Sequence, residues 1–193
     1  SYIMMVAHFD SRFRQAKLQK TVYSYGAGDD AYGVGSILEL LSQALKYRDE
    51  WHQGVRILFT DSEENALDGM KCAAKYNPEL FENVGYVVNL ESRGMNGPVL
   101  LFETSANNEN VLDLYSEAKA PYGYSLTTVV YRFLPNNTDF TIVKDSIPGI
   151  NFSTIDNINY YHVDDDNFEN INHATIQHYG AQIEPILEEF LTS

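Results

Sequence analysis

Three apolar runs in this sequence each lead to side chains that can bind a metal ion, and this recurrence constrains the fold more than any other feature. The runs and the side chains that follow them are Ile3 to Ala7 with His8, Val55 to Phe59 with Glu63-Glu64, and Val84 to Leu90 with Glu91. Their length and β-branched content are typical of buried strands. In a parallel sheet the carboxyl ends of such strands meet along one edge, where ligands bind. The sequence therefore predicts an α/β protein with a polar site at that edge.

The pair Glu63-Glu64 has two possible roles after the second run. One glutamate could bind a metal ion while the other transfers a proton, because neighbouring side chains at a strand end point in different directions. The alternative is that both residues open a helix, where carboxylates complement the helix dipole and are solvated. The pair by itself favours the helix, and the two other runs shift the balance towards a site.

His8 is followed two residues later by Asp10, on the same side of an extended chain. A carboxylate in that position can accept the second ring N–H of His8 and so fix the tautomer whose other nitrogen binds a metal ion. The alternative is a surface histidine beside a turn. This motif alone leaves both interpretations open.

Glycines surround an aspartate pair in the segment from Gly26 to Gly33. Apolar residues recur at helical spacing from Val34, which predicts a helix from near Asp30 to Tyr47. Asp29 at its start is then either an N-cap or a bridging metal ligand. The glycines permit a close approach of the backbone, which a cap alone would not require.

The remaining segments predict further helices and strands. They are helices over Leu67 to Tyr76, Asn107 to Ala118 and Ile171 to Leu191, strands over Val99 to Phe102 and Ile147 to Phe152, and a turn at Pro135-Asn136-Asn137. His162 follows Tyr161 in a loop and precedes the acidic run from Asp164 to Asp166. Acidic runs are usually solvated loops. Here the carboxylates would raise the proton affinity of His162 unless a cation replaced the proton.

Length and composition exclude several classes of protein. A chain of 193 residues fits one domain, residues 1–193, whose core needs neither disulfides nor a structural metal. No apolar run approaches the ~18 residues of a membrane-spanning helix, so we expect no membrane segment. The net charge of −14 and the scattered basic residues argue against nucleic acid as a partner. The single cysteine, Cys72, is predicted to be a core thiol and excludes an internal disulfide.

Five short motifs, taken together and in this order, resemble the zinc aminopeptidases of peptidase family M28. They are His8-Phe9-Asp10, the segment from Gly26 to Gly33, Glu63-Glu64, Asn89-Leu90-Glu91, and Tyr161-His162 followed by Asp166. The form Asn-Leu-Glu-Ser-Arg-Gly resembles the branch that includes vacuolar and endoplasmic-reticulum membrane proteases. The resemblance implies a three-layer α/β/α zinc-exopeptidase fold with a mostly parallel mixed sheet. Because the chain starts directly in a strand-like run, we expect an N-terminally truncated domain that lacks an upstream helix, edge strands and any targeting sequence.

The resemblance also implies a site with two Zn²⁺ ions. Asp29 would bridge both ions and would be joined to Asp30 by a cis peptide bond. The other residues would have these roles: His8 and Glu91 complete one zinc site, Glu64 and His162 complete the other, Glu63 is the general base, Asp10 is the partner of His8, and Tyr161 stabilises the oxyanion. The chemistry agrees, because imidazole and carboxylate suit zinc and a pair of ions can activate water and polarise a carbonyl. Glu91 departs from the aspartate of many family members.

We therefore expect a metallo-aminopeptidase that acts on peptides with a free N-terminus. A second hypothesis keeps the fold but makes the chain a one-zinc aminoacyl transferase resembling glutaminyl cyclases. A third is a non-catalytic binding module, which the presence of every candidate ligand and of the base disfavours. The resemblance permits a secreted or membrane-attached protein, and the sequence predicts neither the oligomeric state nor the preferred N-terminal residue.

Overall fold

The computed structural model of the protein describes residues 1–12, 15–17, 20–106, 108–131, 133 and 136–193. The strands in chain order are β1 (Tyr2–His8), β2 (Gln15–Lys17), β3 (Lys20–Val22), β4 (Gly54–Thr60), β5 (Val84–Ser92), β6 (Leu100–Thr104) and β7 (Gly149–Thr154). The α-helices are α1 (Ala31–Ala44), α2 (Asp68–Tyr76), α3 (Glu109–Tyr115), α4 (Ser125–Tyr131), α5 (Phe140–Val143) and α6 (His173–Thr192). Short 3₁₀ helices are η1 (Leu45–Glu50), η2 (Pro78–Phe81), η3 (Ile158–Tyr160) and η4 (Phe168–Asn170).

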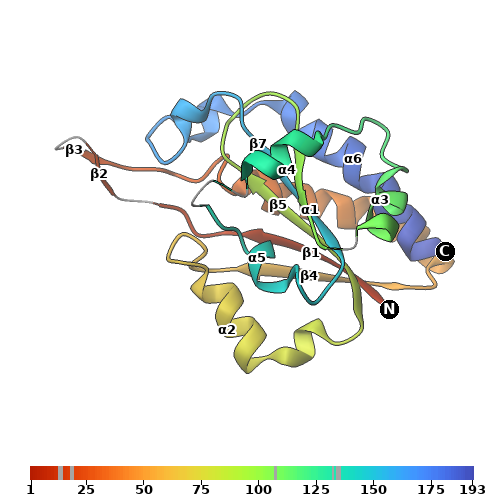
Figure 1. Cartoon of the computed structure of the whole chain (residues 1–193). Coiled ribbons are helices and arrows are strands. Elements are labelled where there is room, and N and C mark those ends of the chain that lie inside the picture. The colour runs from red at the N-terminus through yellow and green to blue at the C-terminus, as the bar shows by residue number, and fades with distance from the viewer. Residues whose placement is uncertain (13–14, 18–19, 107, 132, 134–135) are drawn as a thin grey trace.

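In the described part of the chain, five strands form the central sheet in the order β4-β1-β5-β7-β6. β1 pairs in parallel with β4 and β5, and β5 pairs in parallel with β7, whereas β6 is antiparallel to β7. β2 and β3 form a separate antiparallel hairpin that extends away from the sheet (Figure 1). The structure therefore confirms the predicted α/β class with a mostly parallel mixed sheet.

Helices cover both faces of this sheet and make three layers (Figure 1). On one face, β1 residues such as Ile3 and Met5 pack with Ile37 of α1 and Ile183 of α6 in the larger core cluster. On the other face, α2 and α5 contribute to a smaller cluster. Its buried members are Met4, Val6, Met70, Val87, Phe140, Val143 and Ile147.

β1 lies in the middle of the sheet because both of its faces are apolar. Residues 3–7 are all buried, with alternate side chains in the two core clusters. Such strands are typical of parallel sheets that carry helices on both sides. The strand register pairs His8 with Thr60 of β4 and Val6 with Asn89 of β5. The carboxyl ends of β1, β4 and β5 therefore lie along one edge, as the sequence predicts.

α1 and α6 begin at side-chain caps. Asp30 accepts the backbone N–H of Gly33 at 3.1 Å, and Asn172 accepts those of Ala174 and Thr175 at 2.9 and 3.2 Å. Both helices pack on the same face of the sheet, which anchors the loop before α1 at the sheet edge. Neither of them, nor any other helix among the described residues, combines the length and the apolar character that crossing a membrane requires.

Some element ends differ from the sequence predictions. The helix predicted to reach Tyr47 is α-helical only to Ala44 and continues as η1, within which Tyr47 has non-helical dihedral angles (φ −119°, ψ 30°). α3 starts at Glu109. Asn107, where we predicted that helix to start, and Pro135 of the predicted turn lie outside the described residues.

The prediction that Cys72 is a core thiol is wrong. Cys72 is exposed, although it lies in the predicted helix α2. α2 is amphipathic and buries only Met70, so most of its side chains face solvent. A helical segment with alanines therefore did not suffice to place the thiol in the core.

Candidate metal centre

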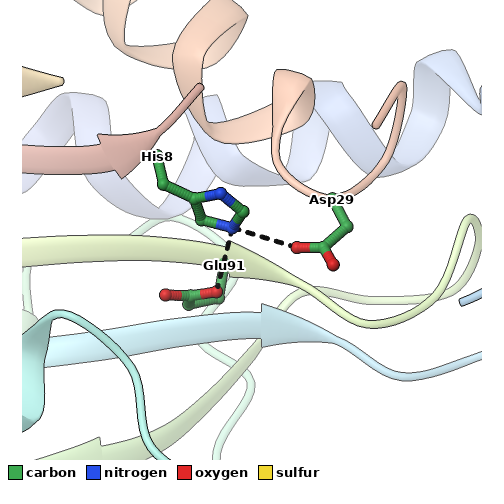
Figure 2. Close-up of side chains that lie close together, drawn as sticks. All are labelled: His8, Asp29 and Glu91. Carbon is green, nitrogen blue, oxygen red and sulfur yellow. Dashed lines mark hydrogen bonds and ion pairs between the residues drawn. The ribbon is translucent and has the colours of Figure 1, made fainter. Parts of the chain in front are cut away.

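Three side chains from separate segments meet at the carboxyl edge of the sheet. His8 ends β1, Glu91 lies on β5, and Asp29 lies in the loop before α1. Nε2 of His8 is 3.1 Å from Oδ1 of Asp29 and 3.8 Å from Oε2 of Glu91, as Figure 2 shows. All three residues are buried, and one ligand atom from each lies within 4.8 Å of the others. This spacing suits a single cation.

A second cluster shares Asp29 with the first. Nε2 of His162 is 3.0 Å from Oδ2 of Asp29 and 2.5 Å from Oε1 of Glu64. Ligand atoms of these three residues also lie within 4.8 Å of one another. The two carboxylate oxygens of Asp29 thus face different histidines, an arrangement in which one carboxylate can bridge two cations.

The loop that carries Asp29 is held by Asp166. One carboxylate oxygen of Asp166 accepts the backbone N–H of Gly28 at 2.5 Å. The other accepts the hydroxyl of Ser24 at 3.1 Å and the backbone N–H of Asp29 at 3.4 Å. The peptide bond between Asp29 and Asp30 is cis, as the family resemblance implies. The sequence did not reveal what Asp166 does, because an acidic run has the same appearance in a solvated loop.

Asp10 orients the turn that contains Glu63 and Glu64. Its two carboxylate oxygens accept their backbone N–H groups at 3.0 and 3.2 Å. Nδ1 of His8 is 3.0 Å from the backbone carbonyl oxygen of Asp10 and 3.4 Å from its carboxylate, so the carbonyl is the nearer acceptor. α2 begins only at Asp68, and the alternative that the glutamate pair opens a helix is therefore wrong.

Carboxylates favour a positive charge on both imidazoles of the site. Burial lowers the pKa of His162, but hydrogen bonds with Asp29 and Glu64 outweigh it and raise the pKa to about 9. Burial likewise opposes protonation of His8, whose pKa is raised by hydrogen bonds with Asp10 and Asp29. A proton on each ring offsets the negative charge around it. A bound cation would do the same and would leave the imidazoles neutral, as metal ligation requires.

Burial and mutual repulsion raise the pKa values of two glutamates of the site. Burial raises the pKa of Glu91 well above its usual value, and the charge of Glu63 adds to this. Burial also raises the pKa of Glu63 to about 8; the positive charge of His8 opposes the rise, and the charge of Asp29 supports it. Divalent cations would relieve this repulsion. Because imidazole and carboxylate are common zinc ligands, the donor set fits Zn²⁺.

A cleft of about 490 Å³ opens over the two clusters, and Glu63 and Tyr161 line it. The ring of Tyr161 stacks on that of His162, with centroids 3.6 Å apart. Burial raises the pKa of Tyr161, so its hydroxyl stays protonated and can donate a hydrogen bond. The guanidinium carbon of Arg93 lies 5.7 Å from the Tyr161 ring centroid and borders the same cleft.

The structure brings the predicted site residues together. The five predicted metal ligands form the two clusters, which consist of His8, Asp29 and Glu91 and of Asp29, Glu64 and His162. The predicted base Glu63 and the predicted oxyanion donor Tyr161 lie in the cleft above them. Asp10 contacts both His8 and the glutamate turn. The roles of these residues stay predictions.

Curated relatives of this chain include much longer proteins. Endoplasmic reticulum metallopeptidase 1 of Homo sapiens is 31% identical over 196 residues, which cover 99% of this chain and 21% of the relative. The vacuolar membrane protease of Verticillium alfalfae is 29% identical over 180 residues, which cover 91% of this chain and 16% of the relative. The chain thus spans about a fifth of the length of these relatives.

Solved structures share the fold at low sequence identity. The LapA aminopeptidase of Legionella pneumophila has a TM-score of 0.75 at 18% identity, covering 100% of this chain and 52% of its own. The glutaminyl cyclase of Porphyromonas gingivalis has a TM-score of 0.70 at 19% identity, covering 97% and 73%. A family model described as peptidase family M28 matches residues 1–187. Because this match covers nearly the whole chain, the protein belongs to peptidase family M28.

Proposed function

We propose that this chain is the catalytic domain of a two-zinc aminopeptidase. The observation that carries the proposal is the shared carboxylate of Asp29, whose oxygens lie 3.1 Å from His8 and 3.0 Å from His162. A carboxylate in this position can hold two ions close together, and two-metal hydrolytic sites have ions about 3.5–4 Å apart. Membership of a peptidase family supports the same activity.

In this proposal Asp29 contributes to both ion sites, as the two clusters of ligand atoms suggest. His8 and Glu91 complete one site, and Glu64 and His162 complete the other. Three protein ligands leave a position open on each ion, as is usual in catalytic rather than structural zinc sites. When bound, the two ions would supply Lewis acidity, which lowers the pKa of a bound water and polarises the scissile carbonyl.

Glu63 and Tyr161 would supply the proton transfer and the hydrogen bonding of the reaction. Burial raises the pKa of Glu63 in the metal-free site, and bound cations would lower it again, so that Glu63 could accept a proton from the attacking water and pass it to the leaving amine. Asp10 fixes its backbone at 3.0 Å. The protonated hydroxyl of Tyr161 can donate a hydrogen bond to the oxygen on which negative charge develops.

The cleft presents both acidic and basic side chains to a substrate. Its lining includes the carboxylates of Asp29, Glu63, Glu64 and Glu91 and the cationic side chains of Arg12, Lys71 and Arg93. The net charge of the lining therefore does not select a substrate. We infer from the aminopeptidase that shares this fold that the substrates are peptides with a free α-amino group, from which the N-terminal residue is removed.

The substitution Glu63→Gln tests the proposal. Zinc-loaded wild-type protein should hydrolyse aminoacyl anilides, and the variant should lose about 10²- to 10⁴-fold in kcat, the usual contribution of a general base. The variant should still bind two zinc ions, because Glu63 is not among the proposed ligands. Glu82→Gln, at an exposed position outside the cleft lining, is the matched control and should keep the wild-type kcat. Unchanged turnover in Glu63→Gln would discard the assigned base.

A one-zinc aminoacyl transferase is the second candidate. It needs only the cluster of Asp29, Glu64 and His162, in which Nε2 of His162 lies within 3.0 Å of both carboxylates. The other cluster is looser, because Nε2 of His8 is 3.8 Å from the carboxylate of Glu91. The fold is also shared with glutaminyl cyclases. A single zinc ion per chain, cyclisation of an N-terminal glutamine and no anilide hydrolysis would favour this candidate. Wild-type protein that takes up no zinc would instead favour a non-catalytic module.

The cellular compartment follows only from the names of the relatives, which refer to the endoplasmic reticulum and to the vacuolar membrane. We propose that this domain likewise works in a membrane-attached protein of such a compartment. Fractionation of cells that express the full-length protein would test this. Recovery in the soluble cytosolic fraction would contradict it.

A further inference from the structure

A row of polar side chains crosses the sheet beside the metal centre. Asn89 on β5 pairs in register with Asn151 on β7, which in turn pairs with Glu103 on β6. The three residues are only 1%, 0% and 5% exposed. Val87, two residues before Asn89 and on the same sheet face, belongs to the apolar core. We call Asn89, Asn151 and Glu103 the polar ladder.

Hydrogen bonds connect the polar ladder to one of the proposed zinc ligands. The side-chain amide of Asn89 donates to Oε1 of Glu91 at 3.3 Å and to Oδ1 of Asn151 at 2.9 Å. The amide of Asn151 donates to Oε2 of Glu103 at 3.2 Å. Lys144, which is partly exposed, donates to the other oxygen of Glu103 at 2.5 Å. The chain of contacts therefore runs from the surface to Glu91.

Each link in this chain fixes the orientation of the next. An ionised carboxylate only accepts hydrogen bonds, so Glu103 beside Lys144 requires the NH₂ group of Asn151 to face it. The oxygen of Asn151 then points to Asn89, whose NH₂ group must turn towards it. The second N–H of that group reaches Glu91. The hydroxyl oxygen of Thr138 also accepts from the NH₂ group of Asn151, at 2.9 Å, and supports the same orientation. Among the described residues Oδ1 of Asn89 has no hydrogen-bond partner.

As a consequence, the two carboxylate oxygens of Glu91 have different contacts. Oε1 accepts the amide of Asn89, and Oε2 is the oxygen that faces His8, at 3.8 Å. Figure 2 shows this oxygen directed towards the ring nitrogen that also faces Asp29. A glutamate has one more rotatable bond than an aspartate. The hydrogen bond from Asn89 removes that freedom.

Burying the polar ladder in this part of the sheet has a cost in free energy, because its amides and carboxylate lose their contact with water. A buried amide or carboxylate costs about 1–3 kcal/mol if it loses a partner, and well-packed apolar side chains often stabilise a core equally well. Val87, two residues before Asn89, and Phe140 of α5 belong to the apolar cluster on this side of the sheet, so apolar packing is available here. The ladder residues therefore differ from their surroundings in a way that packing alone does not require.

We propose that Asn89, Asn151 and Glu103 are positioning residues that hold Glu91 so that a single oxygen, Oε2, is presented to the zinc ion shared with His8. This rests on the proposed two-zinc function. The ladder acts on one of the two ion sites, because its hydrogen bonds lead to Glu91, which belongs to the cluster of His8.

Asn89→Leu tests the ladder, since leucine has a similar size and cannot donate a hydrogen bond. In a competition titration with a chromophoric chelator, wild-type protein should show two zinc dissociation constants. In the variant, one dissociation constant should rise by about 10- to 100-fold, which is the usual effect of removing a hydrogen-bond partner of a metal ligand. The other dissociation constant should stay unchanged. Circular dichroism of the metal-free protein monitors the fold.

The matched control is Gln182→Leu. Gln182 is a fully buried amide that donates to the carbonyl of Val99 and accepts from Tyr115, on the α6 side of the sheet. Its loss should lower stability and leave both zinc dissociation constants unchanged. Equal zinc affinities in Asn89→Leu and wild type would overturn the proposal that the ladder positions Glu91, and would leave the two-zinc function intact. Wild-type protein that binds no zinc would overturn both proposals.

Glu103→Gln decides the question if Asn89→Leu does not fold. The substitution keeps the shape of the side chain but removes the charge that helps to orient Asn151. The zinc dissociation constant that rises in Asn89→Leu should therefore rise here too. Lys144→Arg should keep the wild-type zinc affinity because it keeps a cation at Glu103. Lys144→Met removes that cation and should raise the same zinc dissociation constant. Unchanged constants in both Glu103→Gln and Lys144→Met would overturn the proposal.

Discussion

Asp139 is a buried carboxylate, outside the proposed ligand set, that should make stability depend on pH. It is 1% exposed, its Oδ2 accepts the hydroxyl of Thr60, and within the described residues its Oδ1 has no hydrogen-bond partner. Burial raises its pKa from 3.8 to about 6, although the Thr60 hydrogen bond opposes the rise. The folded state therefore keeps a proton that the unfolded state releases. Stability contributed by this group is lost as pH rises through that interval.

Asp139→Asn should remove this loss. The free energy of unfolding at pH 7 should rise by at most about 3 kcal/mol, since one pKa unit is worth about 1.4 kcal/mol. Near pH 4 the variant and the wild type should be equally stable, because asparagine keeps an acceptor for Thr60. Urea denaturation between pH 4 and 7 in the presence of a chelator measures this, with the exposed Asp145→Asn as control. A variant that is less stable than wild type at pH 7 would contradict the burial argument.

Asp166→Asn should weaken both zinc sites together. Asp166 fixes the loop of Asp29 through Gly28 and Ser24, and asparagine has one acceptor oxygen where aspartate has two. Because Asp29 faces both clusters, both dissociation constants should rise, by about 10- to 100-fold. The exposed neighbour Asp165→Asn should change neither. If only one of the two zinc dissociation constants rises, Asp29 does not bind both ions.

The sequence revealed the proposed ligands more readily than their supports. His8 and Glu91 stand out because a charged or imidazole side chain ends an apolar run, where burial would otherwise be costly. Asp166 and Asn89 give no such signal. An aspartate in an acidic run and an asparagine within a strand have the same appearance whether or not they contact a ligand, and only the strand register brings Asn89 beside Asn151.

At the scale of secondary-structure elements, two helical glycines should respond oppositely to alanine. A Cβ at Gly69, in the first turn of α2, would lie 1.8 Å from the backbone oxygen of Asp61, so the helix must shift. We expect a destabilisation of about 1–3 kcal/mol. A Cβ at Gly35, in the middle of α1, meets nothing within 4 Å, and Gly35→Ala should stabilise by about 0.5–1 kcal/mol. Thermal unfolding measures both, and a neutral Gly69→Ala would contradict the close packing of α2 on the turn.

Strands were predicted more reliably than the details of helices. β1 and β5 are buried along most of their length, as predicted for apolar runs in a sheet covered on both sides. The prediction that the run in β4 is buried is wrong, because β4 lies at one edge of the five-stranded sheet and is only partly buried over residues 54–59. α1 was predicted from its spacing, but its end was not, because apolar spacing does not mark the change from α-helix to 3₁₀ helix after Ala44. Cys72 was misplaced because helical spacing does not say how much of a short helix the sheet covers.

At the scale of the whole molecule, zinc binding should be coupled to folding. The ligands come from β1, the loop before α1, the turn after β4, β5 and the loop after η3, so the unfolded chain cannot assemble them. The protein also carries a net charge of −14, part of which is concentrated at this edge of the sheet. At a free zinc concentration of about 100 times Kd, each site should add about 2.7 kcal/mol to the free energy of unfolding.

Thermal or urea unfolding with and without zinc measures this coupling, and a chelator should reverse it. Magnesium at the same concentration serves as the control, because it prefers oxygen ligands and would use the imidazoles poorly. Equal stabilisation by both metals would indicate unspecific charge screening in place of a zinc site.

The central claim is that two cations share Asp29, and anomalous diffraction at the zinc edge tests it most directly. Crystals of zinc-loaded protein should show two peaks about 3.5–4 Å apart. One peak should lie beside His8 and Glu91, the other beside Glu64 and His162, and both should lie beside the Asp29 carboxylate. A single peak, or two peaks of which one does not touch Asp29, would contradict the account.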